Sequence, residues 1–321
     1  MSWTFPDAGE IGDAERLAVA PALSIVTTTY RHAPYLEQCI DSLAAQKTDF
    51  PFEIVICEDN SPDDTREVAK RLQAKYPHLV RIVFTEKNKG GALNMIFGVS
   101  RAKAPLIAFC EGDDFWVDEH KAARQVAALN RHPEVDMAFT RGYRFYADGE
   151  RALEWDYGEE ARIVQLPELF AGQGWIAPTA SLMFRAETLR NLPPSYGDWT
   201  WGDPVIILSG ARRGGAYYDP APTICYRIAH ATSFTVDLET KPRPERIRFL
   251  EGAIRYWKIA CDFYGFPMRH VRHRVDDYRL AIARMRTEEK QPLGALKAIA
   301  GVSPSFLIGG ALRRLRKKAA R

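Results

Sequence analysis

Three carboxylates lie within four residues of one another, directly after a short apolar run. Residues 106–110 are typical of a buried strand, which would place Glu111, Asp113 and Asp114 at its end. Carboxylates held this close repel one another unless a cation or hydrogen-bond donors lie among them. Such hard oxygen ligands suit Mg²⁺ or Mn²⁺, which proteins hold with one or two carboxylates plus substrate phosphates. The alternative is an acidic surface turn that caps the next helix, as Asp118 would.

Four apolar segments alternate with amphipathic ones in the first third of the chain. We predict strands over 23–29, 52–57, 80–85 and 106–110, with helices beginning at Pro34 and Asp63 and a third over 92–100. Strands that alternate with helices indicate βαβ units and a mostly parallel sheet covered on both faces. Ligands bind beyond the carboxyl ends of such strands.

Polar clusters follow three of these strands, at residues 27–31, 58–61 and 111–114, so we expect them to meet along one edge of the sheet. No GxGxxG follows the first strand, so the usual dinucleotide fingerprint is missing. Gly90 and Gly91 follow the third strand without a Walker lysine-threonine pair.

The remaining chain divides into a second half of the sheet and a helical end. We predict a helix from 117 to about 130, strands over 137–145 and 217–227, and irregular connections around short strands over 148–205. Helices follow from about 245 and over 271–285. We therefore expect an N-terminal extension over 1–20, one domain over 21–235 and a helical region over 236–321.

Bulk composition is that of a globular protein with a large core. The chain has 321 residues, of which 46% are hydrophobic and 26% charged. Its net charge is +3, but residues 313–321 hold six Lys or Arg and no acid, so removing those six charges leaves −3. The basic character therefore belongs to the tail, and we expect no nucleic-acid binding by the body.

Cysteine usage and the N-terminus indicate a cytoplasmic protein. Five cysteines lie far apart with no CxxC pair, and two of them, Cys57 and Cys110, stand in apolar runs where cysteine acts as a small hydrophobe. Residues 1–20 are acidic and lack the apolar core of a secretory signal. No uninterrupted apolar run reaches the length that spans a bilayer.

Segments 23–35, 53–65 and 110–116 resemble family 2 glycosyltransferases with the GT-A fold, and the resemblance covers about residues 22–235. Glu-Gly-Asp-Asp-Phe-Trp followed by Lys121 and Gln125 resembles a bacterial subgroup that builds surface polysaccharides. The resemblance implies an α/β GT-A fold with a mostly parallel, Rossmann-like sheet and a helical C-terminal region. It also implies an inverting sugar transfer from a UDP-, dTDP- or GDP-linked donor to a glycan or lipid-linked acceptor, dependent on Mn²⁺ or Mg²⁺.

The same resemblance assigns roles to individual residues. Asp113 would bind the metal, with His230 completing the site, and Glu111 is a departure from the Asp that usually opens the DxD motif. Asp59 would hydrogen-bond the base, and residues 27–30 would form one side of the nucleotide-binding site. In full, the nucleotide and donor sugar would be contacted by Thr27, Thr28, Thr29, Tyr30, Glu58, Asp59, Lys89, Asn94, Glu111, Gly112, Asp114 and Arg227.

A carboxylate must also take the proton of the attacking hydroxyl, which contributes about 10²–10⁴-fold. Asp203 lies where the family places this base, and Asp198 is the alternative. Asp203 before Pro204 would equally be a good helix N-cap, and the two roles are compatible. Trp199 and Trp201 could stack on a sugar ring or simply pack.

The tail and the overall function each have a second interpretation. Residues 302–312 are apolar with glycines and precede the six basic residues, a pattern that fits either peripheral contact with the inner face of the membrane or a solvated terminus. A nucleotidyltransferase is a rival function, but it would normally need a glycine-rich basic loop where this chain has Thr-Thr-Thr-Tyr-Arg. A non-catalytic nucleotide-binding protein is the other rival, which the presence of Asp113 and Asp203 disfavours.

Overall fold

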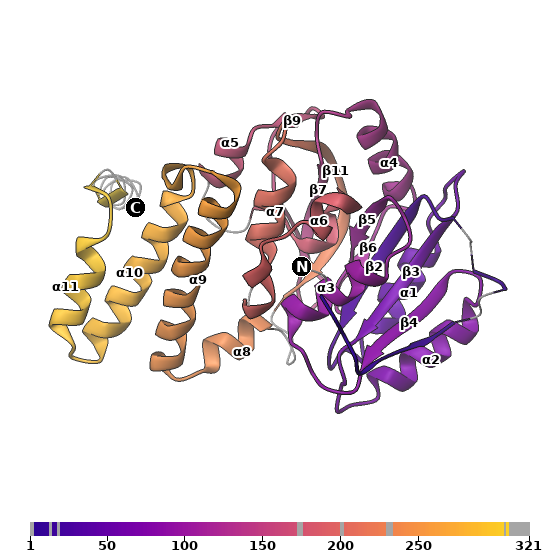
Figure 1. The fold of residues 1–321 in the computed structure, drawn as a ribbon, viewed down its shortest axis with the longest axis horizontal. Coiled ribbons are helices and arrows are strands. Elements are labelled where there is room, and N and C mark those ends of the chain that lie inside the picture. Colours follow the sequence, from indigo (N-terminus) through magenta and orange to yellow (C-terminus); the bar gives the residue numbers. More distant parts are fainter. Residues whose placement is uncertain are drawn as a thin grey trace. The chain divides into compact units, whose positions relative to one another are not determined.

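The computed structural model describes residues 3–12, 15–17, 20–171, 176–199, 202–228, 234–304 and 306–307. They form two units, Met1–Leu166 with Trp175–Asp237, and Pro167–Gly174 with Leu238–Arg321. Across the part of each that is described, the first is an α/β unit and the second is helical (Figure 1).

The first unit is built on a mixed sheet with the strand order β1-β4-β3-β2-β5-β10-β7-β11-β6, to which β8 adds beside β7 and β9 beside β11. Its parallel part is β4-β3-β2-β5, together with the pair β7 and β11, and the other pairs are antiparallel. The strands are β1 Ala8–Ile11, β2 Leu23–Thr29, β3 Phe52–Glu58, β4 Val80–Thr85, β5 Leu106–Phe109, β6 Phe115–Trp116, β7 Met137–Phe145, β8 Arg151–Glu154, β9 Arg162–Val164, β10 Met183–Arg185 and β11 Ala216–Arg227.

Helices cover both faces of the parallel part because its strands are apolar on both sides. Ile25 and Ile54 share a core cluster with Leu36 and Ile40 of α1 (Leu36–Ala44), and α2 (Thr65–Lys75) packs on the same face. Val26, one position along, points to the other face. There α3 (Gly91–Arg101) approaches so closely that a Cβ on Gly98 would lie 2.5 Å from Val26 Cγ1.

The remaining helices of the first unit connect the later strands. They are α4 Lys121–Arg131, α6 Ala186–Arg190, α7 Asp203–Ala211 and the 3₁₀ turns η1 Thr179–Ser181 and η2 Pro194–Asp198. Helices α5 (Leu166–Ala171) and α8 (Phe234–Thr240) lie where the chain passes between the units.

The segment expected to precede the domain contributes to it. Residues 8–11 form β1, which pairs antiparallel with β4 at the edge of the sheet. Arg81 of β4 is 1% exposed, and its Nε lies 2.8 Å from Glu53 Oε2 while its Nη1 lies 3.3 Å from Glu10 Oε1. Burial opposes ionisation of Glu53, but the hydrogen bonds and charge of Arg81 outweigh it and lower the pKa of this carboxyl.

The second unit is a helical hairpin with a third helix added. It contains α9 (Arg243–Tyr264), η3 (Met268–His270), α10 (Arg272–Glu288) and α11 (Pro292–Ala300), and α10 packs against both α9 and α11. Ile247, Ile282 and Met285 form its buried cluster, against which Leu250 and Ala298 pack. No helix in the described part of the chain is both long and apolar enough to cross a membrane.

Candidate active site

The loops after β2, β3 and β5 meet at one edge of the sheet, as the sequence predicts. Strand β2 runs parallel to both β3 and β5, so the carboxyl ends of all three lie together. The amide of Gly112 donates to the carbonyl of Thr28 at 2.9 Å, and the amide of Asp59 donates to the carbonyl of Thr29 at 3.1 Å. The β2 loop therefore lies between the other two.

The β2 and β3 loops are also tied to each other. Arg31 and Asn60 both adopt the left-handed conformation, with φ of 62° and 53°. The amide of Arg31 donates to Ser61 Oγ at 3.1 Å, and that of His32 donates to Thr65 Oγ1 at 2.9 Å. These contacts fix one loop against the other.

Gly112 occupies a place that no larger residue could fill without displacing its neighbours. A Cβ at this position would lie 2.8 Å from Thr29 Oγ1 and 2.9 Å from His32 Nδ1. The glycine thus lets the acidic loop of residues 111–114 approach the β2 loop directly.

The carboxylates of the acidic loop form one electrostatic group with Asp203. Burial raises the pKa of Glu111 well above its usual range, and the charges of Asp203 and then Asp113 raise it further, while a hydrogen bond from Thr179 opposes them. Burial likewise raises the pKa of Asp114, with Asp113 and Glu111 adding to the effect. Such mutual repulsion is what a nearby cation would relieve.

Asp203 reaches this group from the start of α7. Gly202 is the N-cap and Asp203 is the first helical residue, so the N-cap position that the sequence suggested for Asp203 belongs to Gly202. Gly202 is itself required there, because a Cβ on it would meet the Tyr196 hydroxyl. The alternative base, Asp198, is exposed at the end of η2.

Arg227 clamps the acidic loop from β11. Its amide donates to Asp114 Oδ1 at 2.8 Å, and its Nε donates to the carbonyl of Asp113 at 2.9 Å. The guanidinium carbon lies 4.8 Å from the centroid of the Tyr35 ring and 5.0 Å from that of Phe145. Its positive charge thus stands beside the carboxylates while its donors hold their backbone.

Asp59 and Glu58 make different contacts, although they are adjacent. Asp59 is 2% exposed, and its two oxygens accept from the amides of Lys89 at 2.7 Å and Gly90 at 2.9 Å. Burial raises its pKa to about 6. Glu58 pairs with Arg66 at 2.6 Å and accepts from the amide of Ser61 at 2.6 Å, so it anchors the loop.

Two further candidates near β4 also make contacts within the protein. Lys89 Nζ lies 2.8 Å from Asp7 Oδ2 in the N-terminal segment. The side-chain amide of Asn94 is buried in α3 and donates to the carbonyl of Cys57 at 2.9 Å. Both residues therefore support the loop that carries the amides bound to Asp59.

Three buried oxygens at the site have no hydrogen-bond partner within the described residues. They are Thr27 Oγ1, Thr29 Oγ1 and Asp114 Oδ2. Thr28 is partly exposed, and Tyr30, at the end of this loop, is 39% exposed. Trp199 is 4% exposed and packs 5.6 Å from the Tyr196 ring centroid. Trp201 and His230 lie outside the residues that the structure describes.

Two residues that the sequence did not single out join the site. His32 Nε2 lies 3.6 Å from Asp113 Oδ2, and Thr179 donates to Glu111. The position of His32 in the β2 loop was a usable signal, since the flanking residues were candidates. Thr179 gave none, because its 3₁₀ turn reaches the site only through tertiary folding.

The donor set suits a hard divalent cation. Within the described ranges, no three His, Cys, Asp or Glu side chains already converge as a complete metal cluster. Mg²⁺ and Mn²⁺ need only one or two protein carboxylates where substrate phosphates supply the other ligands. Glu111, Asp113 and the unpartnered oxygen of Asp114 fit that requirement.

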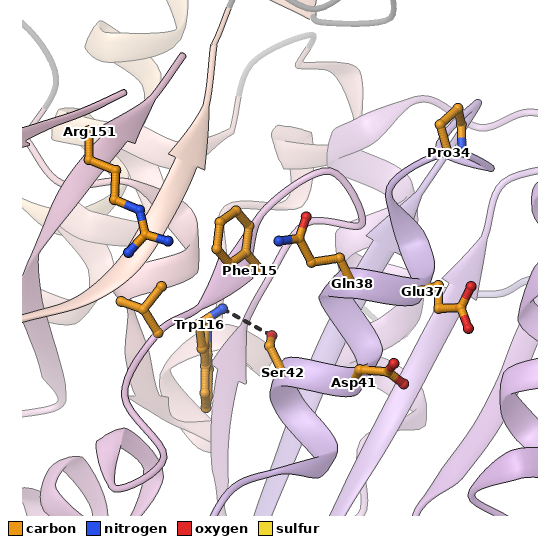
Figure 2. Close-up of a pocket in the computed structure, with 9 residues that line it drawn as sticks. Pro34, Glu37, Gln38, Asp41, Ser42, Phe115, Trp116 and Arg151 are labelled. Atoms are coloured by element: carbon orange, nitrogen blue, oxygen red, sulfur yellow. Dashed lines mark hydrogen bonds between the residues drawn. The ribbon is translucent and has the colours of Figure 1, made fainter. Parts of the chain in front are cut away.

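A hollow of about 740 Å³ lies beside the acidic loop, between α1, β6 and β8 (Figure 2). Phe115, the residue after Asp114, is one of the residues that line the hollow. Gln38 also lines it, and its Oε1 accepts a hydrogen bond from Arg227 at 2.7 Å. Arg151 faces α1 across it. None of residues 111–114 lines the hollow, so it adjoins the carboxylate group without containing it.

Known proteins share both the sequence and the fold. An uncharacterized protein of Mycobacterium tuberculosis is 34% identical over 176 residues, which cover 55% of this chain and 49% of that protein. An uncharacterized glycosyltransferase of Nostoc is 29% identical over 212 residues, 60% of each chain. A putative teichuronic acid biosynthesis glycosyltransferase of Bacillus subtilis, TuaG, is 29% identical over 96 residues, which cover 30% of this chain and 37% of TuaG. The chain spans about half the length of the first of these relatives.

Solved structures match over most of the chain. TarS of S. aureus, in complex with UDP, superimposes with a TM-score of 0.54 at 15% identity, covering 87% of this chain and 90% of that one. The mannosyltransferase PcManGT of Pyrobaculum calidifontis, with GDP-Man and Mn²⁺, gives 0.58 at 18% identity, covering 92% and 81%. At these identities the likeness establishes the fold, which is GT-A as the sequence predicts.

A family model described as Glycosyl transferase family 2 matches residues 24–190, which is more than half of the chain. That stretch contains the ends of β2, β3 and β5, where the polar loops meet. The chain therefore belongs to glycosyl transferase family 2.

Proposed function

We propose that this protein transfers a sugar, with inversion, from a nucleoside diphosphate sugar to an acceptor hydroxyl. The observation that carries the proposal is the electrostatic coupling of Glu111 and Asp113 with Asp203 at the carboxyl ends of the parallel strands. Sugar transfer needs a cation site for the leaving diphosphate and a separate base for the attacking hydroxyl. Carboxylates from two distant parts of the chain can divide these tasks.

The donor nucleotide would lie against the β2 and β3 loops. Thr27 and Thr29 offer buried hydroxyls without partners among the described residues, and Tyr30 offers an exposed ring. Asp59 would accept a hydrogen bond from the base with the lone pairs that the amides of Lys89 and Gly90 leave free. The solved relatives bind UDP, UDP-GlcNAc and GDP-Man, and a nucleotide of this kind would bind against these two loops.

Mn²⁺ or Mg²⁺ would be held by Asp113, with Glu111 facing it directly or through water. Bound there, the cation would neutralise the negative charge that develops on the diphosphate. Arg227 adds a fixed positive charge beside the same group. We assign His230 as a further ligand on its sequence motif alone.

Asp203 would be the base that receives the acceptor proton. Its place beside Glu111 puts a second carboxylate close to the reacting centre, whereas Asp198 is exposed elsewhere. We assign Trp199 and Trp201 to the acceptor side, where the buried Trp199 would act by shaping the wall.

The acceptor would be a glycan or lipid-linked molecule of the cell surface. The names of relatives such as TuaG point to polysaccharide synthesis. We propose that the enzyme works at the cytoplasmic face of the membrane, with the basic tail of residues 313–321 in contact with anionic lipid. The catalytic domain would be residues 21–235, to whose sheet residues 8–11 add an edge strand, with 236–321 as an appended helical region.

A thermal-shift screen of UDP, dTDP and GDP with and without Mn²⁺ tests the nucleotide and metal assignment together. One diphosphate should raise the unfolding temperature only when Mn²⁺ is present, because a ligand that binds the folded state stabilises it by mass action. Asp113→Ala should abolish that metal-dependent shift, and the matched exposed variant Asp198→Ala should keep it. An equal shift in Asp113→Ala would remove Asp113 from the metal site.

Adding nucleoside triphosphates and a sugar-transfer assay to the same screen distinguishes the proposed glycosyltransferase from a nucleotidyltransferase and from a non-catalytic nucleotide-binding protein. A nucleotidyltransferase would prefer a nucleoside triphosphate to the diphosphate. A binding protein would respond to the diphosphate but release no free nucleotide from the sugar donor, even with acceptor extracts present.

A further inference from the structure

The second unit exposes apolar side chains on α11 and just beyond it. Leu293 is 82% exposed, Leu296 63%, and Ile299 and Leu307 39% each. Half of the large hydrophobic residues that are exposed in the described part of the chain fall in this stretch of fifteen. We call the three of them that lie on α11, Leu293, Leu296 and Ile299, the α11 face.

The α11 face is separate from the side of the helix that packs. Leu293 and Leu296 are three positions apart and so neighbour each other along one side of the helix. Ala295 is buried and Ala298 packs against the Ile282 and Met285 cluster, so these two residues hold α11 against α10. Single exposed leucines are ordinary, but a contiguous group of them indicates a surface that meets something apolar.

From Lys290 onward, the charged residues of the chain are all positive, although Glu288 and Glu289 directly precede this segment. Residues 290–321 contain eight Lys or Arg and no Asp or Glu. Lys290 and Lys297 are exposed and flank the leucines, and Arg284 is exposed on α10. The other six cations of the segment follow in residues 313–321.

We infer that the α11 face docks on an anionic phospholipid surface. This inference rests on the membrane contact proposed above for the basic tail, and it identifies the apolar residues that take part in the same contact. The leucines would enter the boundary between headgroups and acyl chains while the flanking lysines remain at the phosphates. A second copy of the chain would instead bring two strongly cationic segments together. A nucleic acid would match the charge but leave the leucines in water.

Docking of this kind gives the tail and the helix different tasks. The six cations of residues 313–321 attract the protein to any anionic surface. The α11 face adds a contact that salt does not screen, because apolar burial is insensitive to ionic strength at moderate salt.

Co-sedimentation with vesicles tests the inference on the full chain. Wild type should bind vesicles of phosphatidylcholine with phosphatidylserine and should not bind phosphatidylcholine alone. The double variant Leu293→Ser, Leu296→Ser should bind the anionic vesicles about tenfold more weakly or worse. Leu153→Ser, which changes an equally apolar side chain 48% exposed on β8, should bind as wild type.

A third variant separates this inference from the broader proposal. Replacing the six basic residues of 313–321 by Gln should abolish the attraction at low salt. If the leucine variant binds as wild type while the Gln variant does not, the α11 face is wrong and the tail contact stands. If wild type ignores anionic vesicles, or forms a dimer that the leucine variant breaks, both are wrong. The nucleotide-dependent thermal shift should be equal in all four proteins, so sugar-donor binding is judged independently.

Discussion

Lys121 Nζ lies 3.9 Å from the centroid of the Trp116 ring, in a position where the lysine side chain has no solvent exposure. Its ammonium also donates to Gln125 Oε1 at 2.6 Å, and the side-chain Nε2 of Gln125 donates to the carbonyl of Ser181 at 2.9 Å. Trp116 ends the strand after the acidic loop, and Ser181 ends the turn that brings Thr179 to Glu111. One buried lysine thus connects the two segments that flank Glu111.

Replacing Lys121 by Met should change how stability depends on pH. Burial lowers the pKa of Lys121 to about 7, whereas an unfolded chain has a value of about 10.4. Between these values the unfolded state binds the additional proton, so the free energy of unfolding of wild type should rise with pH relative to Lys121→Met. The slope approaches about 1.4 kcal/mol per pH unit.

Urea unfolding of both proteins at pH values from below 7 to 10 measures this difference directly. Lys70→Met is the matched control, because Lys70 is 45% exposed and pairs with the exposed Glu67. A stability difference between wild type and Lys121→Met that stays constant over the range would show that Lys121 keeps its ordinary ionisation.

Gly112→Ala should destabilise the protein and weaken nucleotide binding together. The new Cβ would lie 2.8 Å from Thr29 Oγ1 and 2.9 Å from His32 Nδ1, so at least one of these side chains must shift. Overpacking of this kind costs about 1–3 kcal/mol. Thermal unfolding and diphosphate titration of the same samples report the two effects.

A control variant and a double variant make the Gly112→Ala experiment specific. Gly91→Ala at the start of α3 meets nothing within 4 Å and should be close to neutral. Adding Thr29→Ala to Gly112→Ala removes the closest contact and should recover part of the lost stability. Additive losses in the double variant would mean that the two side chains do not compete for this space.

Asp203→Asn should preserve donor binding and lose transfer. The amide keeps the shape of the carboxylate but cannot take the acceptor proton, so turnover should fall by about 10²–10⁴-fold. The diphosphate affinity should be unchanged or higher, because removing a negative charge relieves Glu111. Steady-state turnover beside calorimetric binding measures both, and Asp198→Asn is the comparison. Near-normal turnover of Asp203→Asn would show that the base is another residue.

Asp59→Asn should remove a pH dependence of the opposite sign to that of Lys121. Burial raises the pKa of Asp59 to about 6, above its unfolded value of about 3.9, so the folded state binds the additional proton between those values. The stability of wild type relative to Asp59→Asn should therefore fall as pH rises from 4 to about 6 and then level. Unfolding curves across this range test it, and a difference that stays flat from pH 4 to 6 would mean that the amides of Lys89 and Gly90 keep the pKa at or below its unfolded value.

Much of the first unit could be predicted from its sequence because its signals are local. The β-branched runs at 23–29, 52–57 and 80–85 correspond to β2, β3 and β4 within a residue, and the topology then required their loops to meet. The pairing of β10 between β5 and β7 could not be predicted. This three-residue strand enters the sheet about 75 residues after β5, and a strand that short has no periodicity to detect.

The candidate site divides in the same way. The sequence predicted that Glu111 and Asp113 follow a strand and that Asp203 lies at the start of a helix, as they do. It named Asp59 for the base but grouped Glu58 with the nucleotide contacts, because the pairing of Glu58 with Arg66 depends on how two loops fold. Thr179 was missed for the same reason. The ligand roles of all these residues stay predictions that the experiments above decide.

The loops after β2 and β3 form the two walls of the proposed base pocket. Because Arg31 and Asn60 adopt the left-handed conformation and a hydrogen bond joins the two loops, the conformation of each loop depends on the other. Redesigning the preference for one nucleobase over another would therefore require transplanting residues 27–35 and 58–65 as a pair. Grafting either loop alone from a relative would leave the other without its partner.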